Sequence, residues 1–503
     1  MENFFKTVAD VNGVINDFVW VKLGLFLLIG AGILMTVATK FFQVTHIGHW
    51  WKETIVSVFK KDAEATKKTD KKTISQFQAL CTALAATIGT GNIAGVAAAI
   101  VIGGPGAVFW MWIAAFLGMM TNFSENVLGI YYRRRNKDGE WSGGAMYYLK
   151  EGLGKYKGCK HIGSVLAVLF AIFAILASFG IGNMGQVNKI TLNLESAFFR
   201  NLDLGQIAGI PVISWIIGLS LTVIAGLIII GGLQRIASFA ERVVPFMAIF
   251  YVIGALIIFV MNIQNVGAIF GSIFKFAFGI KAVAGGAAGV AISQVITQGC
   301  KRGVFSNEAG LGSSVMVHSS SNVKEPVVQG MWGIFEVFFD TFVVCSMTAV
   351  VVLSSGYIDL DTGLAVEGVN DATLVSQAFG DVFGRFGEMF VAIAMLLFAF
   401  TTVLGWSQYG TKAVEYLFGA KGVKVYKVIF VLMISSGAIM TSSLAWDISD
   451  TFNGLMMIPN LIGVVALLPL VAKITKNYVN RKINGNDEAP MISYAPEEVS
   501  AEK

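Results

Sequence analysis

Two long apolar segments of the chain contain glycine and polar residues at their centres. The first reads Gly89-Thr90-Gly91-Asn92-Ile93-Ala94-Gly95, and the second reads Phe305-Ser306-Asn307-Glu308-Ala309-Gly310-Leu311-Gly312-Ser313. Glycine interruptions of this kind indicate discontinuous helices, which leave backbone N–H and C=O groups without helical partners. Free N–H groups of a half-helix can hold a carboxylate, and free C=O groups can hold a cation. The two segments are therefore candidates for a binding site.

The two segments also share a motif. Asn-x-Ala-Gly follows a small residue at Asn92 and again at Asn307, 215 residues further on. Taken singly, each segment is explained equally well by close helix packing, which small residues allow. Their corresponding places in two halves of the chain, and the polar residues inside both, favour a site.

Other polar residues lie within or beside apolar segments. Gln186 could hydrogen-bond a solute or could mark a helix end near water. Thr402 and Trp406 are four residues apart and share a helix face, although threonine hydroxyls commonly bond to their own helix. Glu336 and Asp340 have the same spacing; buried acids suggest function, but a lysine or arginine partner would also explain them. The same doubt applies to two further acids, Glu125 and Glu308.

The composition places these segments in a membrane. Apolar residues make up 55% of the 503 residues, whereas charged residues make up 14%. So little charge cannot cover a water-soluble surface, which excludes a cytosolic enzyme. The net charge of +5 reflects membrane orientation and is not evidence for a nucleic-acid partner. The scattered cysteines and histidines form no metal or catalytic cluster, so we expect neither a cofactor nor an enzyme.

Apolar runs long enough to cross a bilayer predict eleven transmembrane helices and an all-α polytopic fold. Continuous runs of this length argue against a β-barrel. The predicted helices cover residues 18–41, 78–101, 107–131, 163–182, 211–231, 243–261, 282–317, 327–353, 386–405, 425–440 and 454–472.

Charge in the loops predicts the orientation. Lysine and arginine concentrate in the first, third and ninth loops, which share one side and should be cytoplasmic. The acidic eighth loop should lie outside. The N-terminus is then extracellular and the C-terminus cytoplasmic, in the cell membrane. The basic first loop could also contact anionic membrane lipid, but orientation alone explains it.

The motif positions predict the domain organisation. Each motif lies in the first helix of a five-helix half, and halves with an odd number of helices insert with opposite topology. Residues 1–75 would hold the extra first helix and a basic loop, residues 76–265 the first repeat, and residues 266–475 the inverted second repeat. Residues 476–503 would form a polar cytoplasmic tail, which we expect to be disordered from Asn484 to Lys503.

The chain resembles the alanine or glycine:cation symporter family. The likeness is carried by residues 89–95 and 305–313, and is supported by residues 142–148 and by the segment with Thr402 and Trp406. It covers nearly the whole chain. It implies a leucine-transporter-like fold with two inverted five-helix repeats, and import of small neutral amino acids such as alanine or glycine with Na⁺.

The resemblance also implies roles for individual residues. The break at 89–92 would offer N–H groups to the substrate carboxylate. The implied substrate-binding residues are Gly89, Thr90, Gly91, Asn92, Gln186, Ser306, Asn307, Thr402 and Trp406. The implied sodium ligands are the carbonyls near Ala85, Ile88 and Phe398 and the hydroxyls of Thr401 and Thr402, an oxygen set that suits a hard cation.

Two other functions remain open from the residues. A proton-coupled carrier is suggested by Glu336 and Asp340, and an ion channel is disfavoured by the absence of a repeated pore loop. Pocket volume is not readable from the sequence, so alanine, glycine, serine and glutamine cannot be ranked.

Overall fold

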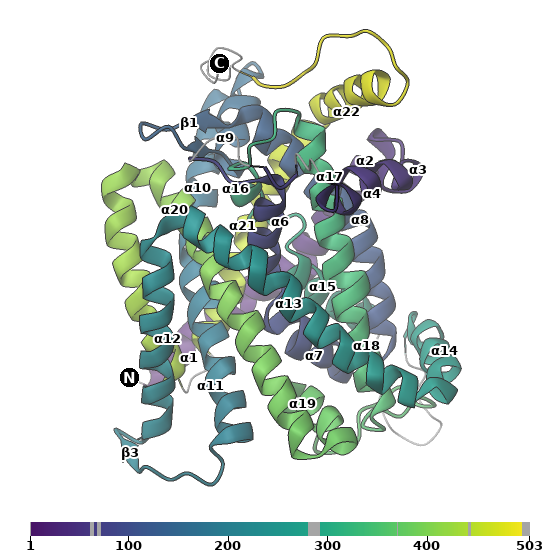
Figure 1. Ribbon diagram of the computed structural model, residues 1–503, viewed down its shortest axis with the longest axis vertical. Helices are drawn as coiled ribbons and strands as arrows, with labels where there is room; N and C mark the ends of the chain where they lie inside the picture. The colour runs from purple at the N-terminus through teal and green to yellow at the C-terminus, as the bar shows by residue number, and fades with distance from the viewer. Residues whose placement is uncertain are drawn as a thin grey trace.

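The computed structural model describes residues 2–60, 65–67, 72–279, 292–369, 371–440 and 444–494. Helices dominate this part of the chain, as predicted (Figure 1). Its named strands form two short antiparallel hairpins, β1 (Arg134–Arg135) with β2 (Trp141–Ser142) and β3 (Gln206–Ile207) with β4 (Ile210–Pro211). Parts of the basic first loop, residues 61–64 and 68–71, lie outside the described residues.

The helical elements follow in chain order, with η denoting π- or 3₁₀-helical turns. The first group is α1 (Glu2–Asp17), η1 (Phe18–Gly24), α2 (Leu25–Ala38), α3 (Phe42–Thr45), α4 (Ile47–Glu53) and α5 (Ile55–Val58). The second is α6 (Gln76–Thr87), η2 (Gly91–Gly95), α7 (Val96–Gly103), α8 (Gly106–Tyr132), α9 (Ala145–Tyr147), η3 (Tyr148–Gly152), η4 (Leu153–Lys155), α10 (Lys160–Phe179), η5 (Gly180–Met184), α11 (Gly185–Phe198), α12 (Val212–Ile230) and α13 (Gly232–Met261). The third is η6 (Ile263–Asn265), α14 (Val266–Phe276), α15 (Ile292–Asn307), α16 (Val315–His318), α17 (Pro326–Val337), η7 (Phe338–Cys345), α18 (Ser346–Ser354), α19 (Asp371–Phe383), α20 (Arg385–Ala438), α21 (Leu444–Ala466) and α22 (Leu468–Lys482).

Eight helices in the described residues are long and apolar enough to cross a membrane, and a bent pair, α6 with η2 and α7, makes up to nine. The eleven predicted segments differ from this count for two reasons. Helix α20 is 54 residues long and contains Gly419 in a non-helical conformation, so that it holds both predicted segments 386–405 and 425–440. The predicted segment 282–317 begins outside the described residues. Its described part is interrupted after α15, which has only 16 residues, several of them polar, and it continues in α16.

The chain ends differ from the sequence-based expectation. Helix α1 precedes the predicted first helix and runs into it through η1, so that one span extends over Lys6–Ala38. At the other end, residues 484–494 form an irregular segment that packs against the protein rather than a disordered tail. The Tyr494 amide donates to the Tyr131 carbonyl at 2.8 Å, and the Lys155 ammonium lies 3.6 Å from the Tyr494 ring centroid. This aromatic contact gives an otherwise polar segment a reason to pack. Residues 495–503 lie outside the described part.

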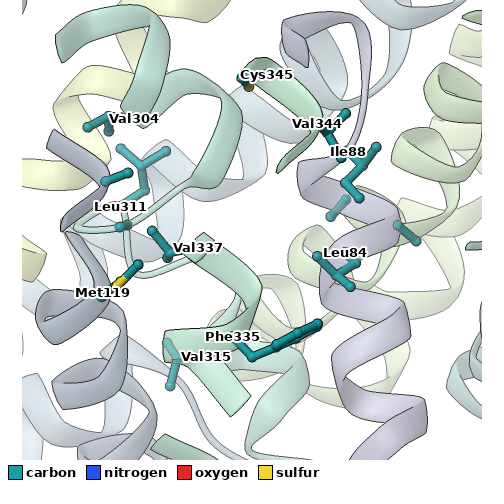
Figure 2. Close-up of a cluster of buried hydrophobic side chains, with 14 of the residues drawn as sticks. Leu84, Ile88, Met119, Val304, Leu311, Val315, Phe335, Val337, Val344 and Cys345 are labelled. Carbon is teal, nitrogen blue, oxygen red and sulfur yellow. The ribbon is translucent and has the colours of Figure 1, made fainter. Parts of the chain in front are cut away.

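The first broken helix is enclosed by its neighbours. Ser75 caps α6 in a capping box with Gln78, and almost every residue of α6 is buried. Figure 2 shows Leu84 and Ile88 of this segment near apolar side chains of other helices, including Phe335 of α17 and Val344 of η7. A helix buried on all sides is apolar all round, which is why α6 has no polar face. The polar groups of the break therefore lie within a closely packed apolar core.

Candidate functional site

The first broken helix bends where its glycines occur. The axes of residues 76–87 and 91–103 differ by 55°. Ile88 has extended backbone angles, φ −76° and ψ 92°. A Cβ atom on Gly89 would lie 2.5 Å from Thr402 Oγ1, which real Cβ contacts do not show. Glycine is required there because α20 approaches the backbone of the break.

Amide side chains accept hydrogen bonds from the backbone N–H groups that the break leaves without helical partners. Asn92 Oδ1 accepts from the Gly89 N–H at 2.9 Å, and Gln186 Oε1 accepts from the Thr90 N–H at 3.3 Å. Both acceptors are neutral. A carboxylate at the same N–H groups would make charge-assisted bonds, which are roughly twice as strong. The geometry therefore suits an exchange of neutral acceptors for a bound carboxylate.

Oxygen atoms from α6 and α20 meet beside the break. Thr402 Oγ1 lies 3.4 Å from the Ile88 carbonyl oxygen and 3.0 Å from the Phe398 carbonyl oxygen. Thr401 Oγ1 lies 2.9 Å from the same Phe398 oxygen. The Gly89 N–H, which would bond the Ala85 carbonyl in a continuous helix, is turned toward Asn92 instead. The arrangement thus brings together carbonyl and hydroxyl oxygens of the kind that hard cations bind.

A small, partly open cavity of about 10 Å³ lies against the break. Its walls include five of the residues predicted to bind substrate: Gly89, Gly91, Gln186, Thr402 and Trp406. The sequence did not identify six other wall residues as binding residues: Ala86, Thr87, Ile181, Phe305, Glu308 and Asn453. Phe305 also lines a second space, on the side where Lys189, Arg302 and Asp371 lie.

Three predicted residues belong to a polar network centred on Asp340 and do not line this cavity. Asn92 Nδ2 donates to Asp340 Oδ1 at 2.6 Å, and Ser306 Oγ donates to Asp340 Oδ2 at 2.8 Å. Asn307 Nδ2 donates to the Thr341 hydroxyl, which itself donates to Asp340. Asp340 therefore joins the first and second broken segments. Among the described residues, it has no lysine, arginine or histidine within ion-pair distance.

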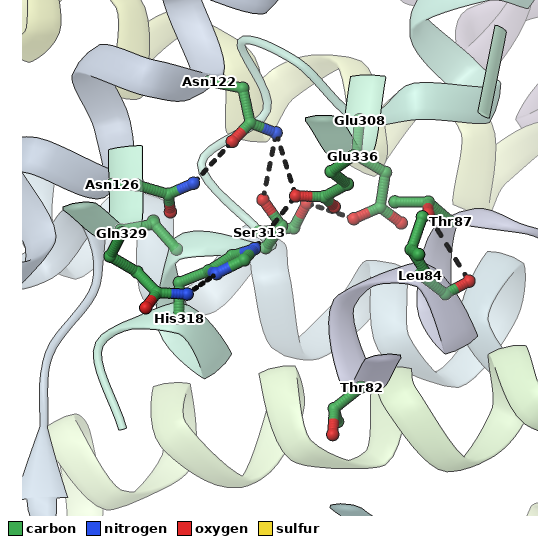
Figure 3. A network of polar contacts seen from close by, with 12 residues as sticks. Thr82, Leu84, Thr87, Asn122, Asn126, Glu308, Ser313, His318, Gln329 and Glu336 are labelled. Carbon is green, nitrogen blue, oxygen red and sulfur yellow. Dashed lines mark hydrogen bonds and ion pairs between the residues drawn. The ribbon is translucent and has the colours of Figure 1, made fainter. Parts of the chain in front are cut away.

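Glu336 belongs to a different network, although it precedes Asp340 by only four residues. Its Oε2 lies 2.9 Å from His318 Nε2, and Asn122 Nδ2 donates to the same oxygen at 3.4 Å. Figure 3 shows this network with Gln329 on the far side of the His318 ring. The side chains of Glu336 and Asp340 enter different networks because the π-helical segment η7 begins between the two residues. His318 is fully buried.

The comparisons with known proteins agree over almost the whole chain. The model of the sodium:alanine symporter family matches residues 5–492. The sodium/alanine symporter AgcS of Methanococcus maripaludis is 42% identical, over 94% of this chain and 97% of that protein. The putative sodium/proton-dependent alanine carrier protein YrbD of Bacillus subtilis is 37% identical, over 95% of this chain and 94% of that protein.

A solved structure bears on the fold alone. MhsT, in a crystal structure with L-phenylalanine, superimposes with a TM-score of 0.51 at 11% identity, covering 81% of this chain and 99% of MhsT. MhsT has the leucine-transporter fold, which the sequence motifs had implied. The family is one of multi-pass membrane transporters and not of enzymes. With a family match from residue 5 to residue 492, the chain belongs to the sodium:alanine symporter family.

Proposed function

We propose that the protein imports small neutral amino acids, such as alanine or glycine, together with Na⁺ across the cell membrane by alternating access. The observation that carries this proposal is the cavity between the first break and α20. There the N–H groups of Gly89 and Thr90 lie next to the oxygen atoms of Ile88 and Thr402. A substrate carboxylate and a cation can therefore bind side by side.

The adjacent sites for the substrate carboxylate and for Na⁺ would couple the binding of the two ligands. Each ligand favours the conformation in which the break and α20 are closed on one another, so each raises the affinity for the other. The inside-negative potential adds about 2.3 kcal/mol per charge for every 100 mV, enough to accumulate a neutral solute with one Na⁺. The substrate-binding residues would be those of the cavity wall, with Asn92, Ser306 and Asn307 behind them.

The cavity is small in this conformation. Its volume of about 10 Å³ is roughly that needed for one water molecule, so the break and α20 must move apart to admit a solute. Trp406 packs against the backbone of Gly182, where a Cβ atom would lie 2.4 Å from the Trp406 side chain.

The proposed topology has eleven spans, with the extra first helix before two inverted five-helix repeats at residues 76–265 and 266–475. The N-terminus would lie outside and the C-terminus in the cytoplasm. Two features support it: the break in α20 at Gly419, which separates two segments that can each span, and the left-handed residues after α15. The second break then corresponds to the first.

Uptake into proteoliposomes tests the function. Purified protein should accumulate labelled alanine or glycine when a Na⁺ gradient is imposed with the pH clamped on both sides. Potassium in place of sodium should abolish accumulation. Uptake that is unchanged without sodium would contradict sodium coupling.

A proton-coupled carrier is the second candidate, and the Asp340 network favours it. A carboxylate held by Asn92 and Ser306, and without a cationic partner among the described residues, could bind a proton in one conformation and release it in another. Accumulation driven by a pH gradient with sodium absent from both sides would establish this mechanism instead.

A further inference from the structure

Glu308 has a backbone conformation that a side chain makes costly. Its φ of +57° lies in the left-handed region, where glycine or asparagine is the less strained choice. Gly310 and Gly312 follow in the same region, with φ of 93° and 73°. The turn after α15 therefore uses glycine at two left-handed positions and a carboxylic acid at a third. Such strain at one position points to a use for its side chain.

The carboxylate of Glu308 is buried without a cationic partner. Only 3% of the residue is exposed. Ser313 Oγ donates to its Oε2 at 2.5 Å, as Figure 3 shows. No lysine, arginine or histidine nitrogen among the described residues lies within ion-pair distance of it. A buried charge in this situation is costly unless a cation joins it.

Glu308 also lines the cavity. The same wall includes Gly89 and Gly91 of the first break. An α-amino acid carries a carboxylate and an ammonium group on adjacent atoms of one small molecule. The break can hold the carboxylate through N–H groups, which leaves the ammonium without a charged partner. Glu308 is the acidic residue in the cavity wall.

We propose that Glu308 binds the α-ammonium group of the substrate and thereby restricts the site to amino acids with a free, protonated amino group. This inference rests on the proposed function. It identifies the residue that would recognise the amino group of the substrate. Ser313 acts as a positioning residue, because its hydroxyl holds the Glu308 carboxylate in place. The 2-hydroxy acids and simple carboxylic acids of the same skeleton would be rejected, because they would leave the Glu308 charge buried and unpaired.

A binding experiment with matched ligands tests the inference. The full chain in lipid nanodiscs with Na⁺ is titrated with glycine, alanine and serine, and binding is followed by the shift in thermal unfolding. The 2-hydroxy acid of the same skeleton is titrated beside each amino acid. We expect Glu308→Gln to weaken amino-acid binding by about tenfold or more while leaving the hydroxy acid unchanged or improved. The preference for the amino acid should therefore fall.

Two variants serve as controls. Glu125→Gln makes the same chemical change at a fully buried acid of α8 that accepts from Asn460 and is not in the cavity wall. It should keep the preference of the wild type. Glu308→Asp keeps the charge on a shorter side chain and should retain part of the preference. The thermal shift produced by Na⁺ alone shows whether each variant is folded and still binds the ion.

The outcomes separate the two proposals. If Glu308→Gln keeps the wild-type preference, or if Glu125→Gln loses it equally, the role of Glu308 is wrong even when sodium-driven uptake by the wild type stands. If the wild type binds amino acids through Glu308 but accumulates none under a Na⁺ gradient, the proposed function is wrong and the ammonium site stands. Absence of any amino-acid binding by the wild type overturns both.

Discussion

At the scale of single residues, the Thr402 hydroxyl connects the broken helix to α20. It lies within 3.4 Å of the Ile88 carbonyl oxygen and also contacts its own helix at Phe398. Thr402→Val keeps the shape of the side chain and removes this oxygen. We expect the Na⁺ concentration for half-maximal uptake to rise by about tenfold or more, because one ligand of the proposed ion site is lost. Uptake as a function of sodium concentration measures the effect.

Thr411 provides the matched control on the same helix. Its hydroxyl is also buried and bonds back to its own helix, at the Ser407 carbonyl, but it reaches no atom of the break that the structure records. Thr411→Val should leave sodium activation as in the wild type. Wild-type sodium activation in Thr402→Val would contradict the placement of the ion.

At the scale of elements, the break in the first broken helix depends on close approach between α20 and the backbone. An alanine Cβ at Gly89 would lie 2.5 Å from Thr402 Oγ1 and 3.3 Å from Gln186 Oε1. Gly89→Ala should therefore separate the two elements and cost about 1–3 kcal/mol in the closed state, as overpacking does. We expect uptake to fall strongly while the protein remains in the membrane, measured by uptake per amount of purified protein.

Gly95 lies on the same broken helix and serves as a control, because no neighbouring element approaches its backbone closely. A Cβ atom there would meet nothing within 4 Å. Gly95→Ala should keep most of the uptake, since alanine is also the better helix former. Equal losses in both variants would mean that the flexibility of glycine in this segment, and not the space at Gly89, controls transport.

At the scale of the whole molecule, the sides on which the loops lie would decide which way the two proposed inverted halves face. Lys137 lies between β1 and β2 in the basic third loop, and Glu367 lies in the acidic eighth loop; both are exposed. In a background with Cys159→Ser, a cysteine in place of Glu367 should react with an impermeant maleimide added to intact cells. A cysteine in place of Lys137 should react only after the membrane is opened.

The remaining native cysteines, Cys81, Cys300 and Cys345, are buried and should give a low background. Labelling of the Lys137 position in intact cells, with the Glu367 position protected, would show that the protein has the opposite orientation. Such a result would leave the fold and the family unchanged and would reverse the proposed sides of the termini.

The sequence by itself determined that the molecule is a membrane protein and located the two broken segments that contribute to the candidate site. Long apolar runs specify membrane helices because backbone groups in lipid must pair within their own segment. Glycine and asparagine inside such runs specify breaks, and their repeated spacing marked both of them. These signals are local, so they are visible without a fold. The prediction of disorder was wrong at residues 484–494, because it rested on the polar composition and did not account for the packing of Tyr494.

Only the tertiary structure decided which side chains share a site. Asn92, Ser306 and Asn307 stand in the predicted motifs, yet they belong to the Asp340 network, while Glu308 in the same motif lines the cavity. Glu336 and Asp340 have the spacing of one helix face and belong to two networks, because η7 intervenes. Spacing assigns a side chain to a face only while the helix is regular. At a break, a left-handed residue or a π-helical turn redirects each side chain, and the neighbouring helices determine what it meets.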